Sequence, residues 1–227
     1  MSLLPTPQVA IVDHRLGNLY NVRNACLWAG MAATVTADRH EIMAADAVIL
    51  PGVGAFGDAM ATLRRLDLVD VLRDLAGTEK PFVGICLGIQ LLMTESFEFG
   101  HHQGLGIVAG QVVPFGAVYE GARRLKVPQV GWNQVHREHQ QSWDGTLMGG
   151  IETGEYFYFV HSFVARPEDS SVVVATTCYG DVSFCAALAK GNVFASQFHP
   201  ERSGAQGLRM YQNLVRQITA RKAGAAA

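Results

Sequence analysis

Over the first hundred residues, short apolar runs alternate with segments in which apolar residues recur every three or four positions. Short unbroken apolar runs are typical of strands buried in a parallel sheet, and the longer period is typical of helices packed on that sheet. The pattern predicts strands at 8–13, 33–36, 47–50 and 82–86, with helices at 19–29, 55–63, 66–76 and after residue 86. This order predicts an α/β fold with a doubly wound, mainly parallel central sheet flanked by helices.

The pattern changes after Gly104, where strand-like runs dominate. Lys190-Gly191-Asn192 predicts a hairpin turn between two of these runs. Helical spacing returns from Leu208 to Ile218, and residues 223–227 are expected to fray. With no linker or internal repeat, we expect one domain over 1–227, with a core of about 8–219 and a β-rich C-terminal half. The strand-like runs are 107–113, 156–160, 172–177, 184–189 and 193–198.

Composition narrows the class of protein. The 227 residues are 49% hydrophobic and 17% charged, which allows a sizeable core. A formal net charge of -2 without a basic run argues against a nucleic-acid partner. No apolar stretch approaches the ~18–20 residues that span a bilayer, and residues 1–5 lack the features of a signal peptide. Four cysteines without a Cys-x-x-Cys pair are expected to be reduced thiols, so we predict a cytoplasmic protein without membrane contact.

The segment Gly84-Ile85-Cys86-Leu87-Gly88 lies where a predicted buried strand turns into a helix. In open α/β sheets, catalytic groups gather outside the carboxyl ends of the strands. A sharp turn there projects the central side chain, and the backbone N–H groups that follow can hold an oxyanion. A helix N-terminus also favours the thiolate form of a cysteine. Cys86 is therefore a candidate nucleophile, whereas Cys26, Cys178 and Cys185 are read as structural thiols.

A thiol nucleophile needs a base, and the base needs an acceptor that orients it. His199 follows a strand-like run, and Glu201 lies two residues later, beyond a proline that stiffens the link. Alone, His-Pro-Glu could be a solvated turn. Combined with Cys86, it predicts a Cys-His-Glu triad.

A third loop, Gly52-Val53-Gly54, follows the end of a predicted strand. Its glycines allow backbone conformations that could aim a peptide N–H at an oxyanion, although an ordinary βα turn or a phosphate-binding loop would also fit. His101-His102 and His136…His139 have no acidic or cysteine cluster beside them, so no metal site is expected. His161-Ser162 could be a substrate rim or a strand end.

Together these segments resemble the class I, or triad, glutamine amidotransferases, from about Val9 to Ile218. The loop at 51–54 and the segment Val130-Gly131-Trp132-Asn133 are most similar to one branch, the glutaminase subunits of imidazole glycerol phosphate synthases in histidine biosynthesis. The other specific parts of the resemblance are 84–90, 126–129, 156–162 and 197–201.

The resemblance implies a role for each motif. Cys86 would attack the carboxamide of L-glutamine and form a γ-glutamyl thioester, His199 would pass a proton to the leaving ammonia, and Glu201 would orient His199. No cofactor is implied. The oxyanion donors would be the N–H of Leu87 and the loop of Gly52, Val53 and Gly54, which in this family is thought to rearrange first. Glutamine would be held by Gln90 and by the backbone of His161, Ser162 and Phe163.

The resemblance also implies a partner. Family members of this branch pair with a (βα)₈-barrel cyclase subunit as a heterodimer. Ammonia passes through that barrel, and the barrel's ligand activates the glutaminase. Asn18, Trp132 and Arg202 match family positions near the docking face, although Trp132 could equally be core and Arg202 a solvated charge.

The chain departs from the family pattern in three places. Asp13-His14-Arg15-Leu16-Gly17-Asn18 replaces the usual Asp-Tyr-Gly-x-Gly-Asn, which alters contacts of this loop with the partner. Phe163 replaces a frequent Tyr but keeps its backbone N–H, and Arg202 replaces a frequent Lys with another geometry for an ion pair. Two alternatives stay open: a class I glutaminase of the vitamin B6 or purine pathway, and a non-catalytic flavodoxin-like binding module.

Overall fold

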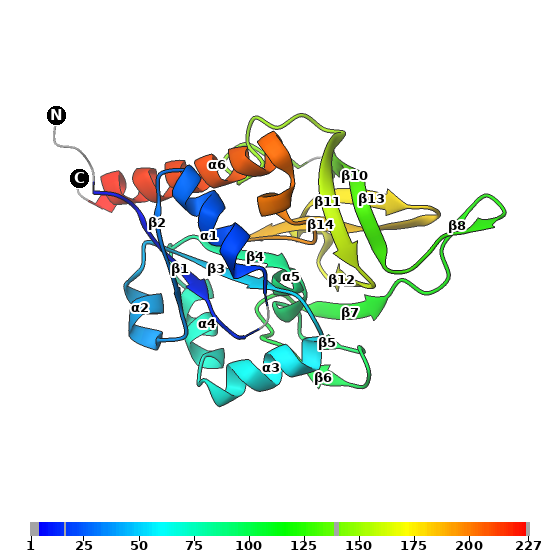
Figure 1. Ribbon diagram of the computed structural model, residues 1–227, viewed down its shortest axis with the longest axis horizontal. Helices are drawn as coiled ribbons and strands as arrows, with labels where there is room; N and C mark the ends of the chain where they lie inside the picture. Colours follow the sequence, from blue (N-terminus) through cyan, green and yellow to red (C-terminus); the bar gives the residue numbers. More distant parts are fainter. Residues whose placement is uncertain (1–4, 16, 139–140, 226–227) are drawn as a thin grey trace.

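The computed structural model describes residues 5–15, 17–138 and 141–225, and a nine-stranded mixed sheet forms its centre (Figure 1). Strands β2, β1, β3, β4 and β15 are mutually parallel, and β14, β13, β10 and β11 continue the sheet in antiparallel fashion. The expected α/β fold with a β-rich C-terminal half is confirmed. The strand order is β11-β10-β13-β14-β15-β4-β3-β1-β2.

The parallel half comes from the N-terminal half of the chain and β15, and the antiparallel half comes from later residues. The nine strands of the main sheet are β1 (Gln8–Val12), β2 (Ala32–Thr36), β3 (Ala47–Gly52), β4 (Phe82–Cys86), β10 (Gln129–Arg137), β11 (Glu155–His161), β13 (Val173–Tyr179), β14 (Val182–Lys190) and β15 (Val193–Ser196). The helices are α1 (Leu19–Trp28), α2 (Arg39–Ala44), α3 (Phe56–Arg65), α4 (Val69–Ala76), α5 (Leu87–Leu91) and α6 (Gly204–Ala225), with 3₁₀ turns η1 (Ser170–Val172) and η2 (Pro200–Arg202).

Alternating side chains on the parallel strands build two cores, one on each face of the sheet. On β1, Val9 and Ile11 pack with α1 and α6, whereas Ala10 and Val12 pack with α2, α3 and α4. Figure 1 shows α1 and α6 on one side of the sheet and α2, α3 and α4 on the other. Burial on both faces explains why these strands read as unbroken apolar runs.

A smaller four-stranded sheet, in the order β12-β7-β5-β6, lies beside the main one. Its strand β12, which follows His161, contacts α5. A two-stranded hairpin of β8 and β9 projects from the body of the molecule (Figure 1). These strands are β5 (Glu95–Ser96), β6 (His102–Gln103), β7 (Gly110–Pro114), β8 (Tyr119–Glu120), β9 (Arg123–Arg124) and β12 (Phe163–Pro167).

The sequence analysis did not predict two elements, helix α2 and strand β10 of the main sheet. Helix α2 has one buried apolar residue, Ile42, so it has no helical periodicity to read; instead Asp38 caps it by accepting hydrogen bonds from the N–H groups of His40 and Glu41. Strand β10 is largely polar, and its pairing with β11 defines it. Such pairing is a long-range contact that the local pattern does not reveal.

Several boundaries were wrong, among them the start of α4, which is Val69 rather than residue 66, and the end of β15, which is Ser196 rather than residue 198. Residues 107–109 form a turn rather than the start of a strand, because the N–H groups of Ile107 and Val108 both donate to the carbonyl of Leu92. Helix α6 continues to Ala225 rather than fraying from 223, consistent with the high helix propensity of alanine. Residues 226–227 lie outside the described part. The predicted hairpin at 190–192 is confirmed, with Gly191 at φ +58°. Among the described helices, none combines the length and the hydrophobicity needed to cross a membrane.

Candidate active site

Cys86 ends β4 and caps α5, at the carboxyl edge of the parallel strands. Its backbone has φ 55° and ψ -104°, an uncommon conformation for a residue with a side chain. Such strain persists only where the surroundings enforce it, and it is concentrated at functional sites. The turn leaves the thiol beside the cavity described below, with the first N–H groups of α5 next to it.

The two flanking glycines, Gly84 and Gly88, allow close packing rather than an unusual backbone conformation. Neither Gly84 nor Gly88 has a positive φ; the strained residue is Cys86 itself. A Cβ on Gly88 would lie 2.1 Å from the carbonyl oxygen of Leu50 on β3, and one on Gly84 would lie 3.0 Å from the Cβ of Ala195 on β15. The glycines therefore let the turn sit against both neighbouring strands.

Gly88→Ala should strongly destabilise the chain, because the added methyl group meets a backbone oxygen that cannot rotate away. Overpacking of this kind costs about 3 kcal/mol or more, a loss of roughly 6–12 °C in Tm for a chain of this size. Thermal unfolding followed by circular dichroism measures it. Gly77→Ala is the matched control, because its Cβ would be at 3.4 Å from the nearest backbone oxygen, an ordinary contact. Equal Tm values for the two variants would contradict the close approach at Gly88.

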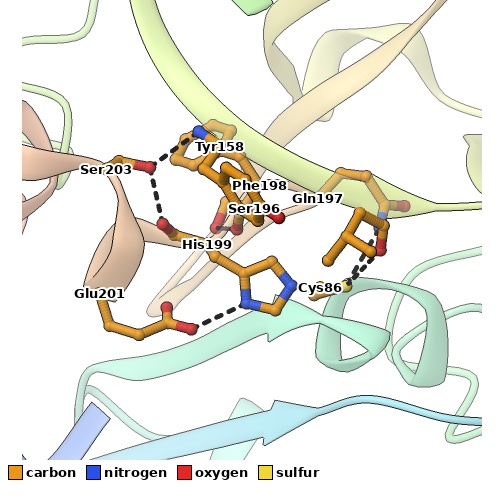
Figure 2. Close-up of polar contacts among 9 residues, drawn as sticks. Cys86, Tyr158, Ser196, Gln197, Phe198, His199, Glu201 and Ser203 are labelled. Carbon is orange, nitrogen blue, oxygen red and sulfur yellow. Dashed lines mark hydrogen bonds and ion pairs between the residues drawn. The ribbon is translucent and has the colours of Figure 1, made fainter. Parts of the chain in front are cut away.

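His199 lies between β15 and η2 and faces Cys86, and Glu201 lies within η2 (Figure 2). The Nδ1 of His199 is 2.8 Å from Oε1 of Glu201, and their side chains are 4% and 1% exposed (Figure 2). The turn is tied to β11, since the His199 N–H donates to the Tyr158 carbonyl and the Ser203 hydroxyl donates to the His199 carbonyl. The carboxylate thus selects the ring tautomer that carries its proton on Nδ1.

The imidazole edge that carries Nε2 faces Cys86 (Figure 2). Burial alone would lower the pKa of His199, but the neighbouring Cys86 and Glu201 outweigh it and raise that pKa to about 10. The sulfur is near enough for this electrostatic effect, although Nε2 has no hydrogen-bond partner among the described residues. The thiol instead contacts the Val160 carbonyl at 3.8 Å, a looser arrangement typical of a site without substrate.

Strand register brings the glycine loop to the nucleophile. In the parallel pair of β3 and β4, Gly52 lies opposite Cys86, and a Cβ on Gly52 would be 2.9 Å from the Cβ of Leu87. Val53 is 39% exposed, and Gly54 has φ +97°, which only glycine adopts readily. The proposed oxyanion donors at 52–54 and Leu87 therefore lie together around Cys86.

A cavity of about 320 Å³ opens beside Cys86, a size suited to a small amino acid. Gln90 reaches into its wall, where Nε2 donates to the carbonyl of Phe163 at 3.0 Å. His161 Nδ1 donates to the same carbonyl at 2.9 Å, and burial lowers the pKa of His161 to about 4, so its ring is neutral. The cavity is lined by Val53, Gly54, Cys86, Leu87, Gln90, Glu98, Phe99, Pro128, Val160, His161, Ser162 and Phe163.

Residues 10–218 match the family model described as "Glutamine amidotransferase class-I". The chain belongs to the class I glutamine amidotransferases. It is 47% identical over 207 residues to the "Imidazole glycerol phosphate synthase subunit HisH" of Rhodopirellula baltica, covering 91% of this chain and 96% of that protein. The protein of the same description from Thermosynechococcus vestitus is 43% identical over 212 residues, with 93% and 98% covered.

Solved structures of glutamine amidotransferases have a fold similar to that of this chain. "Structure of PurLQS from Thermotoga maritima" includes a chain that superposes with a TM-score of 0.70 at 21% identity, covering 93% of this chain and 98% of that one. "Crystal structure of glutamine amidotransferase" gives a TM-score of 0.69 at 20% identity, with the same coverage. At these identities the likeness establishes the fold alone.

Two polar residues of this amidotransferase site were not among those singled out from the sequence. Gln197 is buried and accepts from Gln90 Nε2 at 3.1 Å. Its own Nε2 contacts Cys86 Sγ at 3.7 Å (Figure 2). Glu98 lines the cavity and accepts from the N–H of Phe56 at 2.5 Å. Gln197 directly precedes the Phe198-His199 pair, which was a usable signal. The segment around Glu98 contains no such signal in its sequence, because Glu98 reaches the site through the tertiary packing of the smaller sheet.

The expected interface residues lie on the outside of the amidotransferase. Trp132 on β10 is 55% exposed and packs edge-on against Tyr158, and the guanidinium carbon of Arg202 lies over the Tyr158 ring, 4.3 Å from its centroid. Trp132 is thus not a core residue. Asn18 begins α1, and its side chain makes no capping hydrogen bond.

The histidines considered for metal binding have other surroundings. His101 pairs with Glu95 at 2.7 Å, His136 is exposed, and His139 lies outside the described residues. Within the described ranges, no three His, Cys, Asp or Glu side chains are grouped around a point where a metal ion could sit.

Proposed function

We propose that the chain is the glutaminase subunit of an imidazole glycerol phosphate synthase, releasing glutamate and ammonia from L-glutamine. The observation that carries the proposal is the arrangement of three side chains: Cys86 lines an amino-acid-sized cavity, His199 faces Cys86, and Glu201 is bonded to His199. The relatives described as HisH, which match over about nine tenths of this chain, support the choice of synthase.

In the first half of the reaction, the Cys86 sulfur attacks the carboxamide carbon and the carbonyl becomes an oxyanion. The Leu87 N–H and a peptide N–H of the oxyanion loop, residues 52–54, donate to this oxygen. His199, protonated at Nε2 by the thiol proton, gives that proton to the leaving nitrogen, and ammonia departs as the C–N bond breaks. The product bound to Cys86 is a γ-glutamyl thioester.

In the second half, a water molecule gives a proton to His199 Nε2 and attacks the thioester carbon. The C–S bond breaks, the new γ-carboxyl group gives its proton to solvent so that the product leaves as glutamate, and sulfur and protonated imidazole are left side by side. Glu201 holds Nδ1–H throughout and stabilises the positive ring in both halves. The raised pKa of His199 agrees with an imidazole that carries a second proton beside Cys86 and Glu201.

Glutamine would lie with its side chain toward Cys86 and its charged end toward Glu98. This carboxylate is buried at the cavity wall and suits the α-ammonium group, while Gln90 and the backbone at 161–163 border the rest of the molecule. An ion-paired hydrogen bond that is sheltered from water contributes about 1.5–3 kcal/mol.

Glu98→Gln should therefore raise KM for glutamine by about 10- to 100-fold and change kcat little, because the lost contact holds both the ground state and the transition state. Steady-state glutaminase assays separate the two constants. Glu95→Gln is the matched control, since Glu95 sits on the same segment but bonds His101 and Gln111 instead. A fall in kcat at unchanged KM would place Glu98 outside the substrate site.

The proposed partner is a (βα)₈-barrel cyclase subunit that receives the ammonia and forms imidazole glycerol phosphate and AICAR. A groove of about 1090 Å³ shares Pro128 with the glutamine cavity and contains Trp132. Exposed Val130, Tyr156 and Trp132 give this side of β10 and β11 an apolar character that suits a permanent partner. Asn18 and Arg202 are proposed to contribute polar contacts to the same interface.

The decisive experiment measures glutamate release by the chain alone, with the barrel subunit of its own organism, and with that subunit plus its nucleotide ligand. We expect activity to rise at each step, most strongly with the ligand. Activation by a vitamin B6 or purine synthase partner instead would assign the chain to another amidotransferase. No release of glutamate under any condition would favour a binding module.

A further inference from the structure

His14 lies in the loop between β1 and α1, and it is completely buried. Its Nε2 is 2.6 Å from the carbonyl oxygen of Pro51 on β3. A carbonyl only accepts hydrogen bonds, so Nε2 must carry the proton. Nδ1 is buried without a partner among the described residues, which disfavours a second proton on the ring. The contact thus requires the neutral tautomer with Nε2–H.

The carbonyl that His14 binds belongs to the peptide that opens the oxyanion loop. A peptide unit is planar, so a fixed Pro51 carbonyl also fixes the direction of the Gly52 N–H. Gly52 lies opposite Cys86 and is closely enclosed: a Cβ there would be 3.2 Å from His14 Nε2 and 2.9 Å from the Cβ of Leu87. The imidazole and the first residue of α5 therefore both lie against Gly52, close to where a side chain on this residue would be.

The loop is held unevenly as a result. Pro51 and Gly52 are fully buried strand residues bound to His14, whereas Val53 is 39% exposed and Gly54 has the permissive φ of +97°. A peptide can turn over easily only where its neighbours leave space and where a glycine accepts the new angles. Freedom to reorient is thus concentrated in the two peptides that follow Gly52.

We propose that His14 is a positioning residue for the oxyanion loop. By holding the Pro51–Gly52 peptide, it makes Gly52 the fixed pivot about which the Val53 and Gly54 peptides take up the donating orientation toward the oxyanion. The inference rests on the proposed glutaminase function. His14 touches neither substrate nor reacting atoms in this arrangement; it acts through the Pro51 carbonyl.

The test compares two replacements of His14 in the complete complex with its barrel subunit and nucleotide ligand. His14→Leu keeps the apolar bulk but removes the donor, and kcat for glutamine should fall about 10- to 100-fold with KM within about twofold. The upper bound follows from the cost of losing one oxyanion donor outright, about 10²–10³ in rate. His14→Gln carries an amide N–H that can reach the same carbonyl, and it should recover most of kcat.

A second measurement does not depend on activity. Two-dimensional ¹H–¹⁵N spectra of the imidazole groups, with His14→Gln used to assign the signals, should show His14 as the neutral Nε2–H tautomer at neutral pH. The inference is overturned by an Nδ1–H tautomer, by wild-type kcat in His14→Leu, or by a Gln variant that is folded but as slow as the Leu variant. If the wild-type chain itself releases no glutamate while the tautomer is as expected, the proposed function fails and the contact stands.

Discussion

Cys86→Ala should reduce glutamate release by the activated complex to background, a loss of about 10⁴-fold or more. The alanine removes the only atom proposed to bond to the carboxamide carbon, and no other thiol is placed to replace it. The alanine side chain is no larger than that of cysteine and causes no clash in the turn, so folding and binding of the barrel partner should persist. Glutaminase assays together with a pull-down of the barrel subunit measure both properties.

The other three thiols provide the controls for this prediction. Burial raises the pKa of both Cys26 and Cys185 to about 12, so neither is a thiolate at neutral pH. Cys178 is exposed, and Cys178→Ala should leave the assay unchanged. A glutamine-like electrophile should label Cys86 and spare these three in mass spectra of digests. Activity in Cys86→Ala within tenfold of wild type would remove the residue from its proposed role.

The sequence could predict those features of the fold and the site that are local. Strands such as β1 and β4 are buried on both faces, so their sequences are apolar runs. The thiol of Cys86 is placed at the sheet edge because Cys86 is the last residue of β4. His199 and Glu201 are two residues apart, so a single turn brings them into contact. Where the hydrophobic pattern of a short segment is clear, the local structure depends little on contacts with distant parts of the chain.

The remaining site residues depend on strand register and on contacts across the chain. Glu98 reaches the cavity because β5 pairs with β7, and His14 reaches Pro51 across 37 positions of sequence. The reason for the glycine at 88 is likewise a carbonyl on another strand. The pattern around residue 98 or 14 contains no trace of these partners. The departure at His14 was expected to alter contacts with the partner; within the chain, the structure shows that this side chain contacts Pro51, next to the oxyanion loop.

Glu201→Gln should lower kcat by about 10²–10⁴-fold, since a carboxylate-to-amide change in the Ser-His-Asp triad costs about 10⁴. The amide can still accept from Nδ1 of His199, so the geometry survives, but the negative charge beside the ring is lost. The imidazolium that forms when His199 takes a proton then has Cys86 but no longer Glu201 to stabilise it, and its pKa falls from about 10. Glu120→Gln, in an exposed pair with Arg123, is the control and should leave kcat unchanged.

Glu201→Gln should also change how the free energy of unfolding depends on pH. Because the pKa of His199 in the folded chain, about 10, lies above its ordinary value of 6.5, protonated His199 stabilises the fold fully below pH 6.5. That contribution is lost as the pH rises through about 10. In Glu201→Gln the folded pKa lies nearer the unfolded one, so the loss across this window should be smaller. Urea unfolding at pH 6, 8 and 10 measures it as the difference between variant and wild type, which cancels groups unaffected by the change. Parallel pH profiles for the two proteins would mean that Glu201 does not hold the charge on His199, and the assignment of its role would fail with them.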